Sequence, residues 1–120
     1  MKRAVLSLFW CIPIAAFAAA ASPDNEISYL LNVVRTSAVT FVRNGEDHTA
    51  PEAAAHMQKK RDHFEKEIKS AEDFIDKAAS RSLLSGKEYV IRFSDGSTCS
   101  CSDWLLAILK QFRGAETSGQ

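Results

Sequence analysis

Two cysteines close together are the first residues in this 120-residue chain whose type and spacing could support chemistry. Cys99 and Cys101 are separated by one residue, and a disulfide across that spacing needs a tight turn, because the two Cα atoms must lie about 4.4–6.8 Å apart. A strained, exposed disulfide is easily reduced, which would suit thiol–disulfide exchange. The alternatives are a local disulfide, a bridge between two chains and a pair of free thiols. Because no Cys-x-x-Cys motif at a helix start accompanies the pair, the pattern favours these structural alternatives.

Three histidines, His48, His56 and His63, raise the question of a metal site. His56 and His63 would share one helix face, but seven residues of helix separate them by about 10.5 Å along the axis. One metal ion with ligand bonds of about 2.0–2.1 Å cannot bind both from a straight helix. We therefore expect no metal site and no cofactor, with His56 half-buried in packing and His63 exposed to solvent.

A third group of residues combines cationic, imidazole, amide and hydroxyl side chains at turns and helix ends. An arginine binds a carboxylate or phosphate through parallel hydrogen bonds, and hydroxyl groups and turn amides can complete such a site. We expect this group to form a binding face for a small anionic ligand: Arg43, Asn44, His48, His56, Lys60, Ser80, Ser82 and Ser85. In the competing interpretation Arg43 pairs with Glu46 across a hairpin, and the serines only close a helix end and shape a turn. Because the chain has no glycine-rich phosphate loop, the sequence leaves both interpretations open.

Catalysis by a nucleophilic serine needs a base within reach and an oxyanion donor. The sequence contains no Gly-x-Ser-x-Gly motif, and Glu72, Asp73 and Asp76 are placed as a helix cap and a solvated face. We therefore expect a non-catalytic binding module. A small periplasmic enzyme, either a hydrolase or a thiol oxidoreductase that uses Cys99 and Cys101, is the alternative function.

An apolar segment at the start of the chain indicates export. Residues 4–21 carry no charge, follow the positive Lys2-Arg3 pair and end in a run of alanines, which is typical of a cleaved signal peptide. The sequence therefore predicts a signal peptide over residues 1–21, a single domain over 22–114 and a disordered tail over 115–120. It also predicts a periplasmic or secreted protein with no stable membrane span after signal cleavage.

The composition limits the classes of function that remain. With 46% hydrophobic and 25% charged residues, the chain is that of one small globular domain. Its formal net charge is zero, from 15 basic and 15 acidic residues, so no overall positive field points to nucleic acid. The partners left open are an envelope protein or a small anionic ligand, bound by a monomer or a homodimer.

Helical and alternating patterns predict an order of helix, hairpin, long helix, short helix, strand and helix. Helices are expected over 24–37, 50–69, 71–80 and 104–112, and strands over 39–43, 46–48 and 88–93. The predicted fold class is α+β, in which a small antiparallel sheet, made of a hairpin plus one strand, packs on one face against about four helices.

Turn and capping residues mark several of these boundaries. The Asn44-Gly45 pair suits the positive φ values of a type I′ hairpin turn. The last helix would stop at Gly114 and form the centre of the core, with an exposed apolar strip for a partner as the alternative. Capping boxes are expected at three helix starts: Thr49 with Glu52, Ser70 with Asp73, and Ser100 with Asp103.

An ordered set of short motifs extends over residues 26–113. The set comprises Phe41-Val42-Arg43-Asn44-Gly45, His48, Glu52-Ala53, His56, Ala71-Glu72-Asp73-Phe74-Ile75-Asp76-Lys77, Ala79-Ser80, Ser82, Ser85-Gly86-Lys87 and Tyr89. It resembles the YfeK-like family, short exported bacterial proteins grouped as a domain of unknown function. The resemblance implies a cell-envelope location and a fold, and it carries over no catalytic residue. Cys99-Ser100-Cys101 departs from the family pattern, so any function of these thiols would be particular to this chain.

Overall fold

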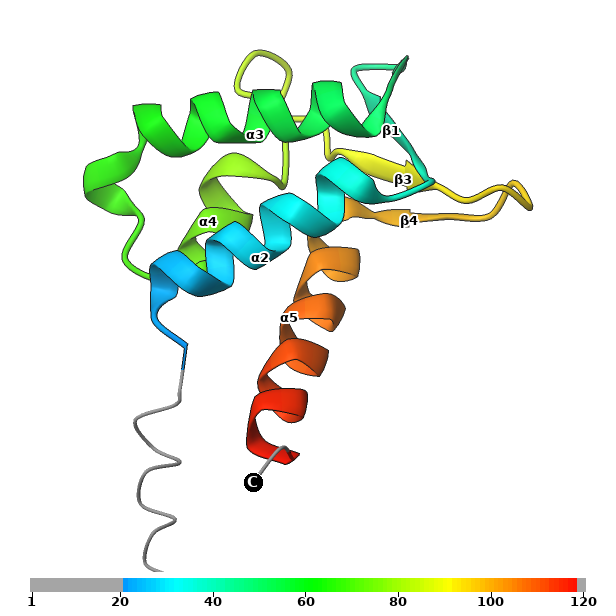
Figure 1. Ribbon diagram of the computed structural model, residues 1–120. Coiled ribbons are helices and arrows are strands. Elements are labelled where there is room, and N and C mark those ends of the chain that lie inside the picture. Colours follow the sequence, from blue (N-terminus) through cyan, green and yellow to red (C-terminus); the bar gives the residue numbers. More distant parts are fainter. Residues whose placement is uncertain (1–20, 119–120) are drawn as a thin grey trace, which may run out of the picture.

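Four α-helices and a four-stranded antiparallel sheet make up residues 21–118, the part of the chain that the computed structural model describes (Figure 1). The predicted α+β class is therefore confirmed. The predicted signal peptide lies outside the described residues, apart from Ala21. The elements follow one another as α2 (Pro23–Thr36), β1 (Thr40–Arg43), β2 (Glu46–His48), α3 (Ala50–His63), the 3-10 turn η2 (Glu65–Glu67), α4 (Ala71–Ala78), β3 (Val90–Arg92), β4 (Thr98–Ser100) and α5 (Cys101–Ser118).

The sheet has the strand order β2-β1-β3-β4, and every neighbouring pair is antiparallel. Its first hairpin turns through Asn44 and Gly45, whose φ angles of 53° and 79° are the left-handed pair that a type I′ turn requires. The predicted register is also confirmed, because Arg43 lies opposite Glu46 and Phe41 lies opposite His48. Phe41 in turn lies opposite Ile91, which joins the hairpin to the C-terminal strands.

The fourth strand, β4, is the element that the sequence prediction missed. Thr98, Cys99 and Ser100 have neither an apolar alternation nor a run of β-branched residues. They become a strand because the turn at Gly96, with φ 91°, folds them back onto β3 and provides a ladder of backbone partners. The sheet is therefore a pair of hairpins rather than one hairpin plus one strand.

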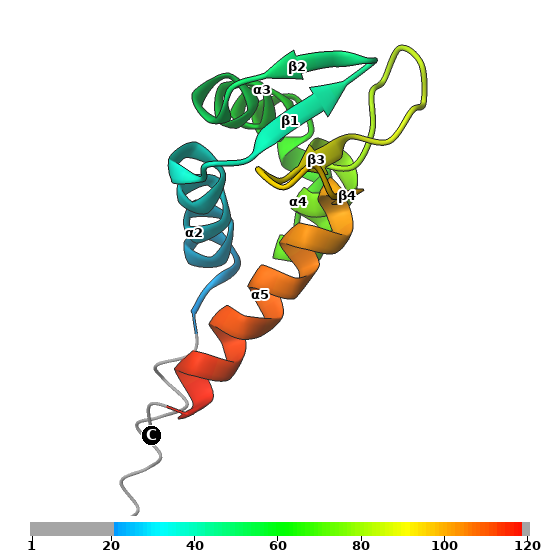
Figure 2. The same ribbon diagram turned by 90° about the vertical axis from the view of Figure 1, so that its right-hand side faces the viewer.

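The core lies between the sheet and the helices on one of its faces. Figure 2 shows α3 behind β1 and β2. From the sheet, Phe41 and Ile91 point into this core, and the Phe41 ring meets Trp104 of α5 edge to face at 5.8 Å. Each of the four helices contributes apolar residues that are fully or almost fully buried: Ile27, Leu30, Leu31, Val34, Met57, Phe74, Ile75, Leu105 and Leu109. The prediction that the last helix packs in the core is confirmed at Leu105 and Leu109, while its opposite side leaves Leu106 exposed.

Two helix ends differ from the prediction. The helix α3 ends at His63 instead of Lys69, because Phe64 leaves the helical conformation at φ −101° and ψ 21° and η2 follows. The chain must reach an extended conformation at Ser70, which caps α4 by accepting a hydrogen bond from the Asp73 amide. The predicted capping box is incomplete, because the Asp73 carboxylate accepts from the amide of Lys69 rather than from that of Ser70. A helix that continued to Lys69 would leave no residues for this change of direction.

At the other end, α5 passes through Gly114 and continues to Ser118, into the segment predicted as a disordered tail. Glycine stops a helix by taking a positive φ, and Gly114 does not take one. The two last residues of that predicted tail, 119–120, lie outside the described residues.

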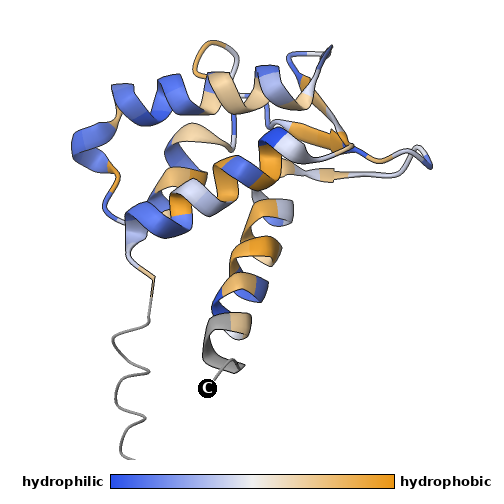
Figure 3. Cartoon of the chain, viewed as in Figure 1, coloured by the Kyte–Doolittle hydropathy of each residue, from blue (hydrophilic) through white to orange (hydrophobic). Residues whose placement is uncertain are grey.

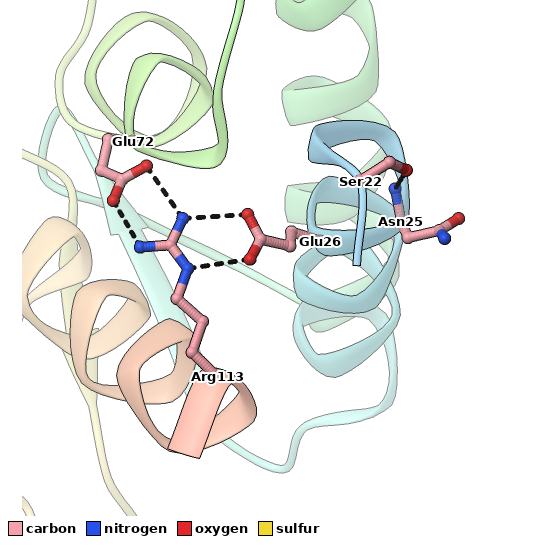
Figure 4. Close-up of polar contacts among 5 residues, drawn as sticks. All are labelled: Ser22, Asn25, Glu26, Glu72 and Arg113. Carbon is pink, nitrogen blue, oxygen red and sulfur yellow. Dashed lines mark hydrogen bonds and ion pairs between the residues drawn. The ribbon is translucent and has the colours of Figure 1, made fainter. Parts of the chain in front are cut away.

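An arginine ties three helices together at the base of the fold (Figure 4). Arg113 of α5 donates from Nε and one terminal nitrogen to Glu26 of α2, at 2.8 and 2.9 Å, and donates again to Glu72 of α4, at 2.6 and 3.1 Å. Glu26 is 8% exposed, so this carboxylate depends on the guanidinium for its charge balance. These hydrogen bonds hold the C-terminal part of α5 against α2 and α4.

Within residues 21–118, no helix is both long and apolar enough to cross a bilayer.

Candidate functional site

The sheet and α3 place a set of polar side chains in one cleft. Side chains alternate along a strand, so Arg43 points to the same face of β1 as the buried Phe41. Extending the pairing of β1 with β3 by one residue sets Tyr89 opposite Arg43 on that face. On α3, which covers this edge of the sheet, His56 and Lys60 are four residues apart and therefore lie on one side of the helix.

His56 is the centre of this arrangement. One terminal nitrogen of Arg43 lies 3.0 Å from both ring nitrogens of His56, and His56 Nε2 lies 3.1 Å from the Tyr89 hydroxyl. Arginine has donors only, so the ring nitrogen that accepts from Arg43 must be unprotonated, and the tautomer decides which of the two nitrogens this is. Burial, with Arg43 and Lys60 nearby, lowers the pKa of His56 from 6.5 to about 4. His56 is therefore a neutral imidazole at physiological pH.

Lys60 is buried next to the Tyr89 ring, with 6% of its surface exposed. Its Nζ donates to the backbone carbonyl of Arg81 at 2.8 Å and to the Tyr89 hydroxyl at 3.1 Å, and it lies 5.0 Å from the centre of the Tyr89 ring. Burial and the neighbouring Arg43 lower the pKa of Lys60, and burial raises the pKa of Tyr89. The ammonium has three donors, so one remains for another partner.

Neither cation of this cleft has an acidic partner among the described residues. The ion pairs of residues 21–118 join other groups, such as Arg92 with Asp47 and Arg61 with Asp24. The predicted cross-hairpin pair of Arg43 with Glu46 is wrong as an ion pair, although the two residues face each other in the register. Arg43 turns inward to His56 instead, because its strand position directs it to the helix-covered face.

The loop between α4 and β3 closes one side of the cleft. Ser82 is buried, and its hydroxyl accepts hydrogen bonds from the Asn44 side-chain amide and from the backbone amides of Leu84 and Ser85. The Ser85 hydroxyl donates to the side-chain carbonyl of Asn44, so the hairpin turn and the loop are fastened together. Ser82 and Ser85 therefore shape the loop.

A cavity of about 350 Å³ results from this arrangement. Five of the eight residues predicted to bind an anion line it: Arg43, Asn44, His56, Lys60 and Ser82. The remaining lining residues, Leu83, Leu84 and Tyr89, were missed by the sequence analysis. Tyr89 carried a signal, since its alternation with Val90 in the predicted strand already placed it on the inward face with Ile91.

The other three predicted residues lie outside the cavity lining. Ser80 is buried and donates to the carbonyl of Ile75, so it closes the end of α4. Ser85 acts through Asn44, as described above. His48 lines a small neighbouring apolar cavity beside Glu52, and its buried Nε2 is without a hydrogen-bond partner among the described residues.

The cysteines are free thiols at the junction of β4 and α5, where Cys99 lies opposite Ile91 in the sheet. Cys99 is half-buried, and Cys101 is fully buried. Burial and the neighbouring Cys99 raise the pKa of the Cys101 thiol to about 12. Because a thiolate is the reactive form, a buried thiol of this kind is a poor nucleophile. The structure therefore gives no support to the thiol–disulfide exchange that the sequence left as an alternative.

Metal-ion and serine-nucleophile sites were the other catalytic possibilities that the residue types raised. In residues 21–118 no group of three or more His, Cys, Asp or Glu side chains could hold a metal ion. His56 hydrogen-bonds to Arg43 and Tyr89, and none of the hydrogen bonds of the described chain joins a serine to a histidine. His56 is half-buried and His63 is exposed, as predicted from the sequence.

Comparison with known proteins gives a family and no activity. The model of a family of unknown function, DUF5329, matches residues 21–113. An uncharacterized protein, YfeK, from Salmonella typhimurium (strain LT2) is 40% identical over 70 residues, which cover 58% of this chain and 58% of that protein. No solved structure matches the chain. The resemblance to the YfeK-like family inferred from the motifs is therefore confirmed.

Proposed function

The chain belongs to the family of unknown function DUF5329, and we propose that it is an exported, non-catalytic binding protein of the bacterial cell envelope whose cleft holds a small anion. The ligand class is a carboxylate or a phosphate. Its negative charge would lie between Arg43 and Lys60, against the hydroxyl of Tyr89 and the ring of His56.

The observation that carries this proposal is a pair of neighbouring cations without an acid. Lys60 is buried beside Arg43, and Arg43 contributes to the lowered pKa of Lys60. Holding a buried ammonium next to a guanidinium costs free energy unless a counter-charge is present. Elsewhere in the described residues the buried carboxylate of Glu26 does have its counter-ion, Arg113. A bound anion would supply the counter-charge for Arg43 and Lys60, as Arg113 supplies the counter-charge for Glu26.

The unused hydrogen-bonding capacity of the cleft supports the same ligand class. Arg43 has five donors and Lys60 has three, and the contacts to His56, Tyr89 and Arg81 occupy only part of them. Charge-assisted hydrogen bonds from such donors are the strong ones, at about 1.5–3 kcal/mol each. Among the described residues, the neutral His56 has no acidic partner that would repel the anion. When the ring is protonated, it becomes a further hydrogen-bond donor.

The test is stabilisation by a simple anion. Inorganic phosphate and acetate are each titrated into the folded protein, with potassium chloride at equal ionic strength as the reference, and unfolding is followed in urea. At a concentration of about 100 Kd, a ligand that binds only the folded state raises the free energy of unfolding by about 2.7 kcal/mol. We expect such a rise with at least one of the two anions.

Matched variants of one helix locate the effect. Lys60→Met removes the buried cation, and Lys59→Met removes the exposed lysine next to it on α3. Loss of one charge-assisted hydrogen bond predicts an affinity lower by about 10-fold or more in Lys60→Met and unchanged in Lys59→Met. Circular dichroism checks that both variants are folded. Equal weakening in the two variants, or no stabilisation of the wild type by either anion, would overturn the proposed function.

Export and the envelope location rest on different observations. They are supported by the uncharged, alanine-ended segment at residues 4–21 and by the resemblance of the chain to short exported proteins. The test is the intact mass of the protein purified from the envelope fraction. We expect a chain that begins at residue 21 or 22, whereas a full-length mass in that fraction would overturn signal cleavage.

A further inference from the structure

Two leucines beside the cleft are unusually exposed for their size. Leu83 is 64% exposed and Leu84 is 96% exposed, whereas Tyr29 and Leu106, the other large exposed hydrophobic residues among those described, reach 39% and 42%. Both leucines lie in the loop that stands above α3 in Figure 1, and Figure 3 colours part of this loop as hydrophobic. The same two side chains line the cleft that contains Arg43 and Lys60.

The loop is fastened in this conformation at both ends. Ser82 donates its backbone amide to the carbonyl of Lys87 at 3.0 Å, and its own carbonyl accepts from Gly86 at 2.9 Å. Its hydroxyl caps the following amides, and Ser85 holds Asn44 of the hairpin. The leucines are therefore displayed by a hydrogen-bonded loop, and their contact with water is unfavourable unless something apolar covers them.

The cleft thus has a cationic floor and an apolar rim. A ligand that satisfies only the floor would leave Leu83 and Leu84 in water, and a purely apolar ligand would leave Arg43 and Lys60 without a counter-charge. We infer that the ligand is an anionic amphiphile, with a phosphate or carboxylate head group between Arg43 and Lys60 and a hydrocarbon group that leaves the cleft across Leu83 and Leu84. This inference rests on the proposed function and deepens it by naming the other half of the ligand.

The size of the cavity agrees with this division of the ligand. A volume of about 350 Å³ is near the lower end for small-molecule sites, which span about 300–1,000 Å³. It accommodates a head group with a few carbons and leaves the rest of a longer chain outside. The remainder would lie against the exposed leucines of the loop, where an apolar contact gains the most.

The test compares anions that differ only in their hydrocarbon. Inorganic phosphate, ethyl phosphate, butyl phosphate and hexyl phosphate, all kept monomeric, are titrated into the full protein by calorimetry. Each methylene that leaves water adds about two- to four-fold to the affinity. We expect the affinity to rise along this series in the wild type.

Two matched leucine variants show where the hydrocarbon lies. A double variant, Leu83→Ser with Leu84→Ser, should lose the dependence of the affinity on chain length. Leu106→Ser, which changes a half-exposed leucine of α5 away from the cleft, should keep that dependence. These substitutions are at exposed positions, so both variants are expected to fold.

The outcomes separate this inference from the proposed function. If phosphate binds but the affinity stays flat along the series, or if the double serine variant keeps the chain-length dependence, the inference is wrong and the anion site stands. If none of the phosphates binds, the inference is wrong, and the proposed function is wrong as well if acetate also fails to stabilise the folded protein.

A second arm identifies the source of the amphiphile. The protein is sedimented with vesicles of phosphatidylcholine alone and with vesicles that also contain phosphatidic acid. Binding that requires phosphatidic acid and is lost in Lys60→Met supports a membrane lipid as the source. Binding of alkyl phosphates without vesicle binding supports a free amphiphile, and equal binding to both kinds of vesicle would overturn the role of the head group.

Discussion

The neutral His56 makes the stability of this fold depend on pH in a defined direction. Its pKa is about 4 in the folded protein and 6.5 in the absence of its surroundings. Between these two values the unfolded chain binds a proton at His56 and the folded chain does not. Unfolding therefore takes up a proton, and the free energy of unfolding decreases as the pH falls through this window.

The magnitude follows from the same two values. One proton of difference changes the free energy of unfolding by about 1.4 kcal/mol for each pH unit. Over the whole interval from pH 6.5 to about 4 the upper limit is about 3.5 kcal/mol. Because His56 is only half-buried, solvent screening reduces the expected loss to about 1–2 kcal/mol.

The variant His56→Gln isolates this contribution. Glutamine keeps a polar side chain beside Arg43 and Tyr89 but does not titrate, while the other histidines and all the carboxylates are common to both proteins. Urea unfolding is measured from pH 7 to pH 4.5, with the fluorescence of Trp104 in α5 as the probe. We expect the wild type to lose about 1–2 kcal/mol more stability than the variant across this range.

Two results would refute this reasoning. Parallel stability curves for the wild type and His56→Gln would mean that His56 binds its proton equally in both states. A titration of the His56 ring followed by NMR that gave a pKa at or above 6.5 would mean that burial and the cations do not suppress its charge.

Three further predictions test other parts of the molecule. An anion in the cleft favours the protonated ring of His56, and phosphate itself also takes up a proton between pH 7 and pH 5, so His56→Gln serves as the reference. On going from pH 7 to pH 5 the affinity for inorganic phosphate should increase in the wild type relative to this variant, and calorimetry in buffers of different ionisation enthalpy should show greater proton uptake on binding in the wild type. Arg113→Met leaves the buried Glu26 carboxylate unpaired and should lower the free energy of unfolding by about 1–3 kcal/mol in urea, less than for a fully buried pair because Arg113 is half-exposed. Iodoacetamide should leave Cys101 unlabelled in the folded protein and label it after unfolding, and rapid native labelling of Cys101 rather than Cys99 would contradict its burial.

The features that the sequence predicted correctly are those decided by near neighbours in the chain. Asn44 and Gly45 form the turn because of their own tolerance of positive φ. Thr49 and Glu52 cap α3 because each reaches the backbone of the other, three residues away. In such motifs the interacting groups are all contained in a few consecutive residues, so no knowledge of the tertiary fold is needed.

The features that it missed depend on distant partners. The strand β4 exists because β3 pairs with it, and the polar segment Thr98–Ser100 has no strand signal of its own. The end of α3 depends on where α4 must begin, and the continuation of α5 past Gly114 accompanies the contact of Arg113 with Glu26 and Glu72. Periodicity along one element carries no information about these constraints.

The candidate site combines features that are decided by near neighbours in the chain with features that depend on distant partners. The residue types of the site could be recognised from the sequence, because each belongs to a local pattern. These patterns are a cation on a hairpin, two basic or imidazole side chains on a helix, and serines in a turn. Which of them meet could not be recognised, and the sequence therefore grouped Ser80 with residues that it does not join, whereas His48 meets Arg43 and His56 at the small neighbouring cavity. Tyr89, which links His56 to Lys60, was taken only as a strand residue.

The register of one short hairpin controls the whole site. Arg43 and Phe41 share a face of β1, so the burial of the Phe41 ring against Trp104 also turns Arg43 toward His56 and Tyr89. A slip of one residue in the pairing would carry Phe41 out of the core and Arg43 into solvent together. The free energy that fixes the hydrophobic core therefore also holds the guanidinium beside the ammonium of Lys60, against the repulsion between them. These two like charges, kept together by the packing of their neighbours, are the arrangement on which the proposed anion site rests.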